Sequence, residues 1–254
     1  MLKELQFAGD PVLVTGGGSG IGQACCAALA ELGASLMIVG RTEAKLRETE
    51  ALVREKGASA AVFVADVSDE NQVAALRDDV ERKWGRLRGL VNNAGDNFVK
   101  SIDELSTEKW REIVAVDLDS VFFMCRAFIP LLLKAKKPAI VNVASTFGVI
   151  GHPRMPVYCA AKGGVVNLSR QLAVDYGAND LRVNSLCPGP TLSPRVKSYF
   201  DRGIVPRAPT EDMVMLKRLA ECDEIANVAA FLLSEAASFV HGATIIVDGG
   251  QTIH

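Results

Sequence analysis

The stretch that decides the fold is Pro11-Val-Leu-Val-Thr15, which runs directly into Gly16-Gly-Gly-Ser-Gly20-Ile-Gly22 and then into a helical pattern. This order predicts a buried strand, a glycine-rich turn and a helix. In such a unit Gly16 takes the tight turn, Gly20 lets the backbone approach a pyrophosphate, and Gly22 lets the helix pack close to the strand. The free N–H groups at the start of the helix then face the anion. A flexible loop without a ligand is the alternative, and the flanking strand and helix argue against it.

Outward from this unit, short β-branched runs alternate with longer periodic segments, which is typical of a parallel sheet. The expected strands are Val12 to Thr15, Leu36 to Val39, Ala61 to Ala65, Leu90 to Asn92, Ala139 to Val143, Arg182 to Leu186 and Thr244 to Val247. The expected helices are Ile21 to Leu32, Glu43 to Glu55, Asn71 to Trp84, Glu108 to Lys134, Val157 to Tyr176 and Glu224 to Leu233. Right-handed crossovers turn this order into an α/β, Rossmann-type, doubly wound parallel seven-stranded sheet in a three-layer α/β/α sandwich, with the ligand crevice beyond the carboxyl ends of the strands.

Length and composition favour one domain over residues 1–254, because 254 residues with 49% hydrophobic side chains suffice for a single large core. Lys and Arg total 28 against 30 Asp and Glu, so a net charge of −2 gives no field that would attract nucleic acid or an anionic membrane. The six cysteines show neither a CxxC pair nor zinc-ligand spacing, which favours buried, reduced thiols. No apolar run approaches the roughly 18 residues that span a bilayer, and we expect a soluble cytoplasmic protein.

The second expected strand ends in Val39-Gly40-Arg41, at the place that faces the adenosine ribose in folds of this kind. An acidic residue would accept from the 2′-hydroxyl and repel a 2′-phosphate, whereas Gly40 leaves space and Arg41 supplies a charged fork. The sequence therefore favours NADP over NAD, with NAD still open. Arg41 as a solvated residue of the first helical turn is the alternative, and Ser19 is not the basic residue that often accompanies 2′-phosphate binding.

Motifs spread over nearly the whole chain resemble those of the short-chain dehydrogenase/reductase family. Thr15-Gly-Gly-Gly-Ser-Gly-Ile-Gly22 is similar to its TGxxxGIG, Asn92-Asn-Ala-Gly95 to its NNAG, and Tyr158-Cys-Ala-Ala-Lys162 to its YxxxK, with Ser145 at the family's separation from Tyr158. Pro188-Gly189 follows a strand, and Val247-Asp-Gly-Gly250 lies near the end of the chain as in many members. The resemblance implies a cofactor site made of Gly16, Ser19, Gly20, Ile21, Gly22, Arg41, Asp66, Val67, Asn93, Ala94, Gly95, Tyr158, Lys162, Pro188, Gly189 and Thr191.

The YxxxK spacing has a physical meaning of its own, because residues four apart on a helix share a face. A free tyrosine titrates near 10, so acid–base work near neutral pH needs a shift of about 3 units, or roughly 4 kcal/mol. An ammonium about 5 Å away at an effective dielectric near 20 supplies about 3 kcal/mol. Taken alone, Tyr158 could be a core residue and Lys162 a solvated one.

The resemblance and the chemistry together imply the catalytic roles. Tyr158 gives a proton to a carbonyl or takes one from an alcohol, Ser145 hydrogen-bonds that oxygen, and Lys162 binds the nicotinamide ribose and lowers the tyrosine pKa. Hydride passes directly between cofactor and substrate, so no metal is expected. The three histidines are isolated and form no ligand set.

One position departs from the family pattern, because Asp117 stands where a catalytic asparagine is usual. That asparagine supports a water that links the lysine to solvent. If its role lies in backbone geometry, an aspartate can replace it; if the amide matters, the proton relay is impaired. A carboxylate near Lys162 favours the ammonium but offsets its effect on Tyr158.

Three further positions have two interpretations each. Asp66 either accepts from the adenine amino group, as the matching family residue does, or is a turn residue, with Ser68 or Asp69 capping the next helix. Thr191 either contacts the nicotinamide carboxamide or is a plain turn residue. Asn92 is expected to stabilise the central strands.

A proline-rich, apolar stretch at about residues 192–218 is expected to be a substrate lid. Its six basic residues exceed its three acidic residues, which leaves +3 and suggests either a carboxylated or phosphorylated substrate or a solvated basic face. Phe98, Phe147, His152 and Met155 are expected near the pocket, with Ser145, Phe147, His152 and Tyr158 as substrate contacts, although plain packing also suits the apolar ones.

Two function classes remain open. The first is an NADP-preferring oxidoreductase that interconverts a small-molecule carbonyl and a secondary alcohol. The second is a sensor or scaffold that binds NADP without turnover, and such relatives would be expected to lack Tyr158 or Lys162. The helices from Glu108 and Val157 resemble the family's subunit contacts and predict a homotetramer or dimer. Core packing alone is the alternative explanation for the prominent side chains of the first helix, which are Phe122, Phe123, Phe128 and Leu131.

Overall fold

The computed structural model describes residues 3–253, and its centre is a sheet of seven parallel strands in the order β3-β2-β1-β4-β5-β6-β7. The strands are β1 (Pro11–Thr15), β2 (Ser35–Gly40), β3 (Ala60–Val64), β4 (Gly89–Asn92), β5 (Ala139–Val143), β6 (Arg182–Pro188) and β7 (Thr244–Val247). Every residue of β1, β4, β5 and β6 is buried, as expected for a parallel sheet that is covered on both faces. The strand order reverses between β1 and β4, and this switch point opens the ligand crevice of such sheets.

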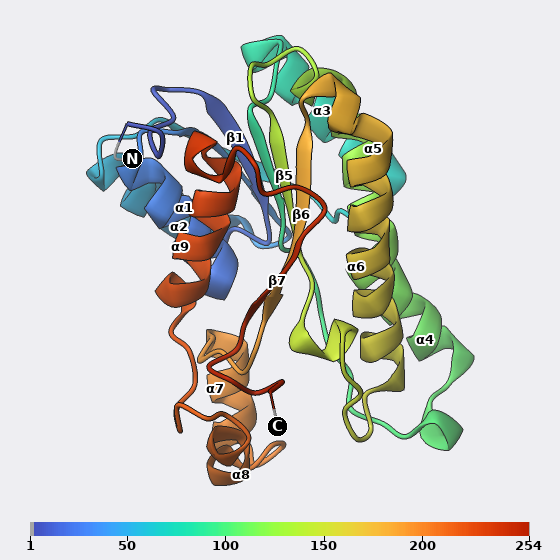
Figure 1. The fold of residues 1–254 in the computed structure, drawn as a ribbon. Coiled ribbons are helices and arrows are strands. Elements are labelled where there is room, and N and C mark those ends of the chain that lie inside the picture. The colour runs from blue at the N-terminus through green and yellow to red at the C-terminus, as the bar shows by residue number, and fades with distance from the viewer. Residues whose placement is uncertain (1–2, 254) are drawn as a thin grey trace.

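Helices cover the sheet in two layers, which confirms the three-layer α/β/α prediction. On one face lie α1 (Gly20–Glu31), α2 (Glu43–Glu55) and α9 (Cys222–Leu233); on the other lie α3 (Glu70–Trp84), α5 (Ser120–Leu132) and α6 (Pro156–Tyr176) (Figure 1). Each layer packs on the sheet through its own apolar cluster. None of the helices in residues 3–253 combines the length and apolar character needed to cross a bilayer.

Helix ends agree with the local sequence signals. Asp69, one of two expected caps, accepts from the backbone N–H groups of Asn71 and Gln72 at the start of α3. The long helix expected from Glu108 to Lys134 is instead α4 (Thr107–Val114), a π-helical turn over Ala115–Asp119, and α5. The helical path is continuous, but the wider turn changes which side chains face inward, an effect that a 3.6-residue period does not predict.

Two buried arginines close the carboxyl end of α9. Arg182 donates from Nη1 to the Leu232 carbonyl at 2.6 Å and from Nη2 to the Ser234 carbonyl at 2.9 Å. Arg88 donates to the Leu233 carbonyl at 3.2 Å. Burial lowers the pKa of Arg182 to about 10. The carbonyl end of a helix carries partial negative charge, so these cations satisfy groups that the helix itself leaves unpaired.

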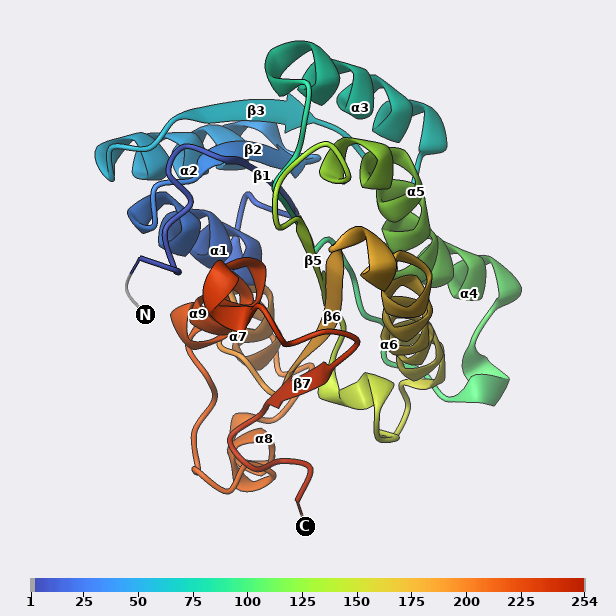
Figure 2. The ribbon, with the colours of Figure 1, turned by 45° about the horizontal axis from the view of Figure 1, so that its top comes forward.

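The lid stretch contains two short helices, α7 (Pro194–Asp201) and α8 (Arg207–Asp212), which lie below the sheet in Figure 1. In Figure 2 α8 lies near the carboxyl-terminal segment. The segment after α8 packs on the last turn of the chain, because the Leu216 N–H donates to the Gly249 carbonyl at 3.1 Å. The lid thus lines the crevice and also contacts the carboxyl-terminal segment.

Candidate active site

A cavity of about 540 Å³ lies beyond the carboxyl ends of the strands, within the size range of small-molecule sites. Its lining includes Gly16, Ser19, Gly20, Ile21, Arg41, Asp66, Val67, Asn93, Ala94, Gly95, Asp117, Ser145, Phe147, His152, Tyr158, Lys162, Pro188, Gly189 and Thr191. Every residue that the sequence placed at the cofactor, catalytic or substrate site lines this cavity, except Gly22 and Phe98. The fold therefore brings segments from the whole chain to one place.

The glycine turn forms one end of the cavity. Gly16 and Gly20 have positive φ angles of 65° and 56°, which a side chain would strain. Gly22 lies behind the turn, where a Cβ atom would meet the Gly16 carbonyl oxygen at 2.2 Å. Its role is the close helix packing that the sequence predicted. Ser19 stands before α1 with extended backbone, and its side chain makes no hydrogen bond to the first turn. This turn is a cradle with room for a phosphate group.

Charged side chains lie where β2 and β3 end. Arg41 is 63% exposed, and its Nη1 lies 3.9 Å from Asp66 Oδ2. Asp66 Oδ1 accepts from both the N–H and the hydroxyl of Ser68, so Asp66 does serve as a turn residue, and it also lines the cavity. Lys45 adds a second cation to this end. We had not predicted Lys45, although it is one helical turn beyond Arg41 in sequence.

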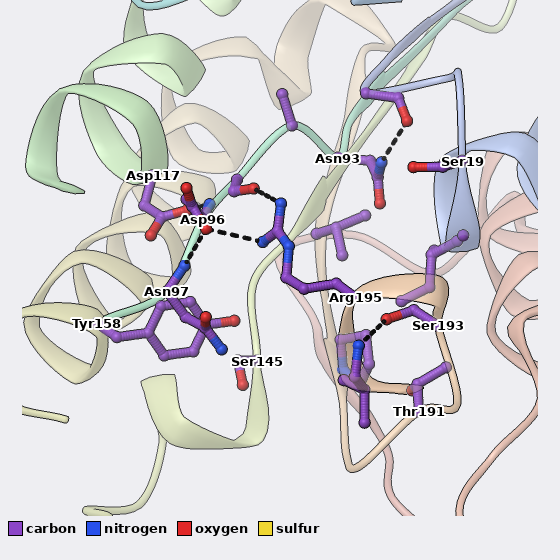
Figure 3. Close-up of a pocket in the computed structure, with 18 of the residues that line it drawn as sticks. Ser19, Asn93, Asp96, Asn97, Asp117, Ser145, Tyr158, Thr191, Ser193 and Arg195 are labelled. Atoms are coloured by element: carbon purple, nitrogen blue, oxygen red, sulfur yellow. Dashed lines mark hydrogen bonds and ion pairs between the residues drawn. The ribbon is translucent and has the colours of Figure 1, made fainter. Parts of the chain in front are cut away.

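Tyr158, Asp117 and Ser145 line one part of the cavity (Figure 3), and Lys162 lines it beside Asp117. Lys162 Nζ lies 5.7 Å from the centre of the Tyr158 ring and 3.4 Å from Asp117 Oδ1. The ammonium also donates to the Val143 carbonyl at 3.3 Å. Ser145 follows β5, and its Oγ accepts from the Phe147 N–H at 3.2 Å. The two residues of the YxxxK motif thus share one helix face, as the spacing predicted.

Burial and charge act against each other in this cluster. Burial raises the pKa of the Tyr158 phenol, the Lys162 ammonium opposes that rise, and the Asp117 carboxylate adds to it. Burial also raises the pKa of Asp117, with Lys162 opposing. For Lys162, burial lowers the pKa but Asp117 and Tyr158 outweigh it, so the pKa is raised and the ammonium is favoured. A buried carboxylate at this position therefore weakens the help that Lys162 gives to a phenolate.

Gly95 in the Asn-Asn-Ala-Gly motif leaves the space that this cluster occupies. A Cβ atom at Gly95 would lie 2.5 Å from Asp117 Oδ1 and 3.1 Å from Lys162 Nζ. The preceding Asn92 is buried and donates to Asn142 Oδ1 at 2.8 Å, so it joins two central strands as expected. Asn93 donates to the Thr15 carbonyl at 3.0 Å and ties the motif to the end of β1.

Aromatic and apolar side chains line the other end of the cavity. The rings of Phe147 and His152 lie 4.3 Å apart, centre to centre. Met155 lines the cavity as expected, but Phe98 does not; the Lys109 ammonium lies 5.1 Å from the centre of its ring. Sequence order places Phe98 near the motif without fixing the direction of its side chain. The lid adds side chains that we had not predicted individually as site residues: Tyr199, Phe200, Val205, Thr210 and Met213.

Three of the six basic side chains of the lid pair with carboxylates, and a fourth donates to a backbone carbonyl. Arg195 pairs with Asp96, and Arg207 with Glu211 at 2.8 Å. Arg218 makes two hydrogen bonds to Glu224, and the Lys217 ammonium donates to a backbone carbonyl. Four of the six basic residues are therefore engaged, which argues against a lid built for an anionic substrate.

A family described as Enoyl-(Acyl carrier protein) reductase matches residues 16–252. Meso-2,3-butanediol dehydrogenase of Serratia marcescens is 39% identical over 250 residues, which are 98% of this chain and 96% of that protein. Levodione reductase of Leifsonia aquatica is 36% identical over 255 residues, 97% of this chain and 96% of that protein.

Solved structures agree with these sequence matches. The crystal structure of a levodione reductase superposes with a TM-score of 0.91 at 34% identity, covering 98% of this chain and 99% of that one. A structure described as an NAD(P)-dependent gluconate 5-dehydrogenase from Beutenbergia cavernae, with NADP bound at low occupancy, has a TM-score of 0.93 at 32% identity, covering 99% and 100%.

The fold and the site define an oxidoreductase class that acts on alcohols and carbonyl compounds. The chain belongs to the short-chain dehydrogenase/reductase family, as the motifs indicated.

Proposed function

We propose that this protein interconverts a secondary alcohol and a ketone by direct hydride transfer with a nicotinamide dinucleotide, NADP(H) in preference to NAD(H). The observation that carries the proposal is the position of Tyr158, 5.7 Å from the Lys162 ammonium, on the wall of the same cavity that contains the glycine turn. A sensor or scaffold without turnover has no need for a phenol and an ammonium at this place.

The protein's own groups handle the proton. Tyr158 donates its phenolic proton to the carbonyl oxygen in reduction, and its phenolate takes the hydroxyl proton in oxidation. Ser145 donates a hydrogen bond to the same oxygen and stabilises the charge that develops there. Lys162 favours the phenolate electrostatically and would hold the nicotinamide ribose, while the glycine turn would hold the pyrophosphate. When bound, the dinucleotide supplies or accepts the hydride.

A Tyr158→Phe variant tests the enzymatic role. We expect turnover to fall at least 10²-fold, because general acid–base catalysis contributes about 10²- to 10⁴-fold. Binding of the reduced dinucleotide, followed by its fluorescence, should change by less than threefold. Tyr176→Phe, on the same helix but not lining the cavity, is the control. Wild-type turnover in the Tyr158 variant would refute the assignment and favour a sensor.

The preference for NADP rests on Gly40, Arg41 and Lys45, which line one end of the cavity. Gly40 leaves space, and the two cations suit a 2′-phosphate. Asp66 lies 3.9 Å from Arg41 and partly offsets this charge. We expect kcat/KM with NADP to exceed that with NAD by at least tenfold, and Arg41→Ala to remove most of this difference by raising the KM for NADP. Arg54→Ala, on the same helix layer but outside the cavity, should leave the ratio unchanged. Equal efficiency with both cofactors in the wild type would contradict the preference.

We propose a small, uncharged substrate, because the free cations of the lid are few and the substrate end of the cavity contains Val99, Phe147, Met155 and Phe200. Butanediol and cyclopentanol appear in the names of relatives, and cis-4-hydroxycyclohexanecarboxylate appears in another. A panel of neutral alcohols with their ketones and one hydroxycarboxylate, followed by nicotinamide absorbance, separates the two classes. Preference for the hydroxycarboxylate would contradict this assignment.

We also propose that residues 1–254 form one domain, with the lid at about 192–218, and that the protein is a homotetramer or dimer. Two of the four side chains considered for subunit contacts, Phe128 and Leu131, lie in the core, whereas Phe122 is 44% exposed. Elution as a monomer at micromolar concentration would contradict the oligomer.

A further inference from the structure

The lid helix α7 is attached to the loop after β4 by two side chains on one face. Arg195 donates from Nη2 to the Gly95 carbonyl at 2.9 Å, and its Nη1 lies 3.3 Å from Asp96 Oδ1. Tyr199 donates from its hydroxyl to Asn97 Oδ1 at 2.7 Å. Positions 195 and 199 are four apart, so both side chains extend from the same face of α7. Three consecutive loop residues are thus held by the lid, and Figure 3 shows Arg195 beside Asp96.

The other side of the same loop supports the acid–base cluster. The Asp96 N–H donates to Asp117 Oδ1 at 2.9 Å, and this oxygen lies 3.4 Å from Lys162 Nζ. Gly95 is so close to the pair that a Cβ atom there would overlap Asp117 Oδ1. A shift of the loop therefore changes the position of the carboxylate relative to the ammonium.

Asp117 has few other contacts that could hold it. Its side chain is fully buried, and its Oδ2 has no hydrogen-bond partner among the described residues. The carboxylate is oriented through Oδ1 alone, by the loop N–H and by Lys162. The residue that anchors the loop consequently also determines the geometry of this carboxylate.

We propose that Arg195 is a positioning residue of the proposed dehydrogenase: it fastens the closed lid to Gly95 and Asp96 and so sets the Asp117–Lys162 pair that supports Tyr158. The expected change in kcat rests on the proposed function, whereas the contact between the lid and the loop does not. Arg195 touches the loop and acts on the cluster through it. Its charge also acts directly, because, after burial and the charges of Lys162 and Asp117, the guanidinium opposes the raised pKa of Tyr158. Lid closure and acid–base competence become one event.

Substrate binding is the competing role for a cation in this cavity. Arg195 already lies against the Asp96 carboxylate, so an anionic substrate would have to displace an internal partner. A substrate-binding Arg195 would affect the KM of the substrate, whereas a positioning residue affects kcat.

The experiment uses three test variants: Arg195→Gln, Asp96→Asn and the double variant that combines these two substitutions. The control variant is Lys197→Gln. Lys197 is exposed on the same helix and does not line the cavity, so this control removes the same charge without the contact. Two readouts are taken: steady-state kcat and KM, and the rate of tryptic cleavage after Lys197 or Arg202 in the protein without added cofactor. Because Lys197→Gln removes the tryptic site at position 197, the cleavage rate of this variant is measured after Arg202.

We expect each single variant to lower kcat and to speed cleavage by about fivefold, the upper end for an ion pair of this exposure. KM for the substrate should stay within twofold, and the double variant should be no worse than the more affected single variant. Additive losses, a change confined to KM, or unchanged cleavage would overturn the proposal. If the protein shows no dehydrogenase activity, the cleavage rates still test the lid contact, so the two failures are distinguishable.

Discussion

Asp117→Asn tests how far a buried carboxylate controls the proposed base. In alcohol oxidation Tyr158 must be a phenolate, so kcat/KM rises with pH through the Tyr158 pKa. The Asp117 carboxylate contributes to the raised pKa of Tyr158, after burial and against Lys162. Its removal with little change of shape should therefore lower the pH at which oxidation reaches half of its maximum.

The magnitude follows from the geometry. Lys162 Nζ lies 3.4 Å from Asp117 Oδ1 and 5.7 Å from the centre of the Tyr158 ring, and these two distances share one atom. The carboxylate oxygen is thus within about 9 Å of the ring centre and, because the phenolate oxygen lies about 3 Å from that centre, within about 12 Å of the charge. At an effective dielectric of about 20 the repulsion of a phenolate is then at least ~1.4 kcal/mol. At 1.36 kcal/mol per pKa unit, this energy corresponds to about one unit.

The assay is the pH profile of kcat/KM for oxidation at saturating cofactor. We expect the midpoint of Asp117→Asn about one pH unit below that of the wild type. Asp119→Asn, two residues along the same π-helical turn, makes the same charge change outside the cavity and should leave the midpoint unchanged. Coincident profiles for wild type and Asp117→Asn, or a midpoint that moves upward, would refute this coupling.

Two further variants test how the structure supports the site and the fold. Gly95→Ala introduces a methyl group 2.5 Å from Asp117 Oδ1, so we expect kcat to fall at least tenfold. Because the overlapped side chain is buried, the free energy of unfolding should also fall, by about 1–3 kcal/mol. Gly151→Ala, where no atom lies within 4 Å of the added methyl, should leave both quantities unchanged, and retained turnover in Gly95→Ala would contradict the role given to this glycine. Arg182→Met leaves carbonyls at the end of α9 without partners, so the free energy of unfolding measured in urea should fall by about 2–3 kcal/mol. The control Arg82→Met, at an exposed position, should lower it by less than ~0.5 kcal/mol. Equal losses of stability in the two variants would contradict the capping role of Arg182.

The sequence by itself determined the layers of the fold, and it predicted most of the residues that line the cavity. Strand, glycine turn and helix follow one another within residues 11–31, and Tyr158 and Lys162 share a face because the helical period is local. These features depend on residues that are close together in the chain, so the spacing of the residues is enough to predict them. Asp69 as a cap and Asn92 as a link between strands belong to the same group.

Only the tertiary structure decided the contacts between distant segments. It directed Phe98 out of the cavity and placed Phe128 in the core. It also brought Arg195 to Gly95, 100 residues away, and set Asp117 against Lys162. Such pairs form where helices and loops that are remote in the chain converge beyond the carboxyl ends of the strands. Sequence spacing does not encode that convergence, because the direction of each loop side chain depends on packing against elements remote in the chain.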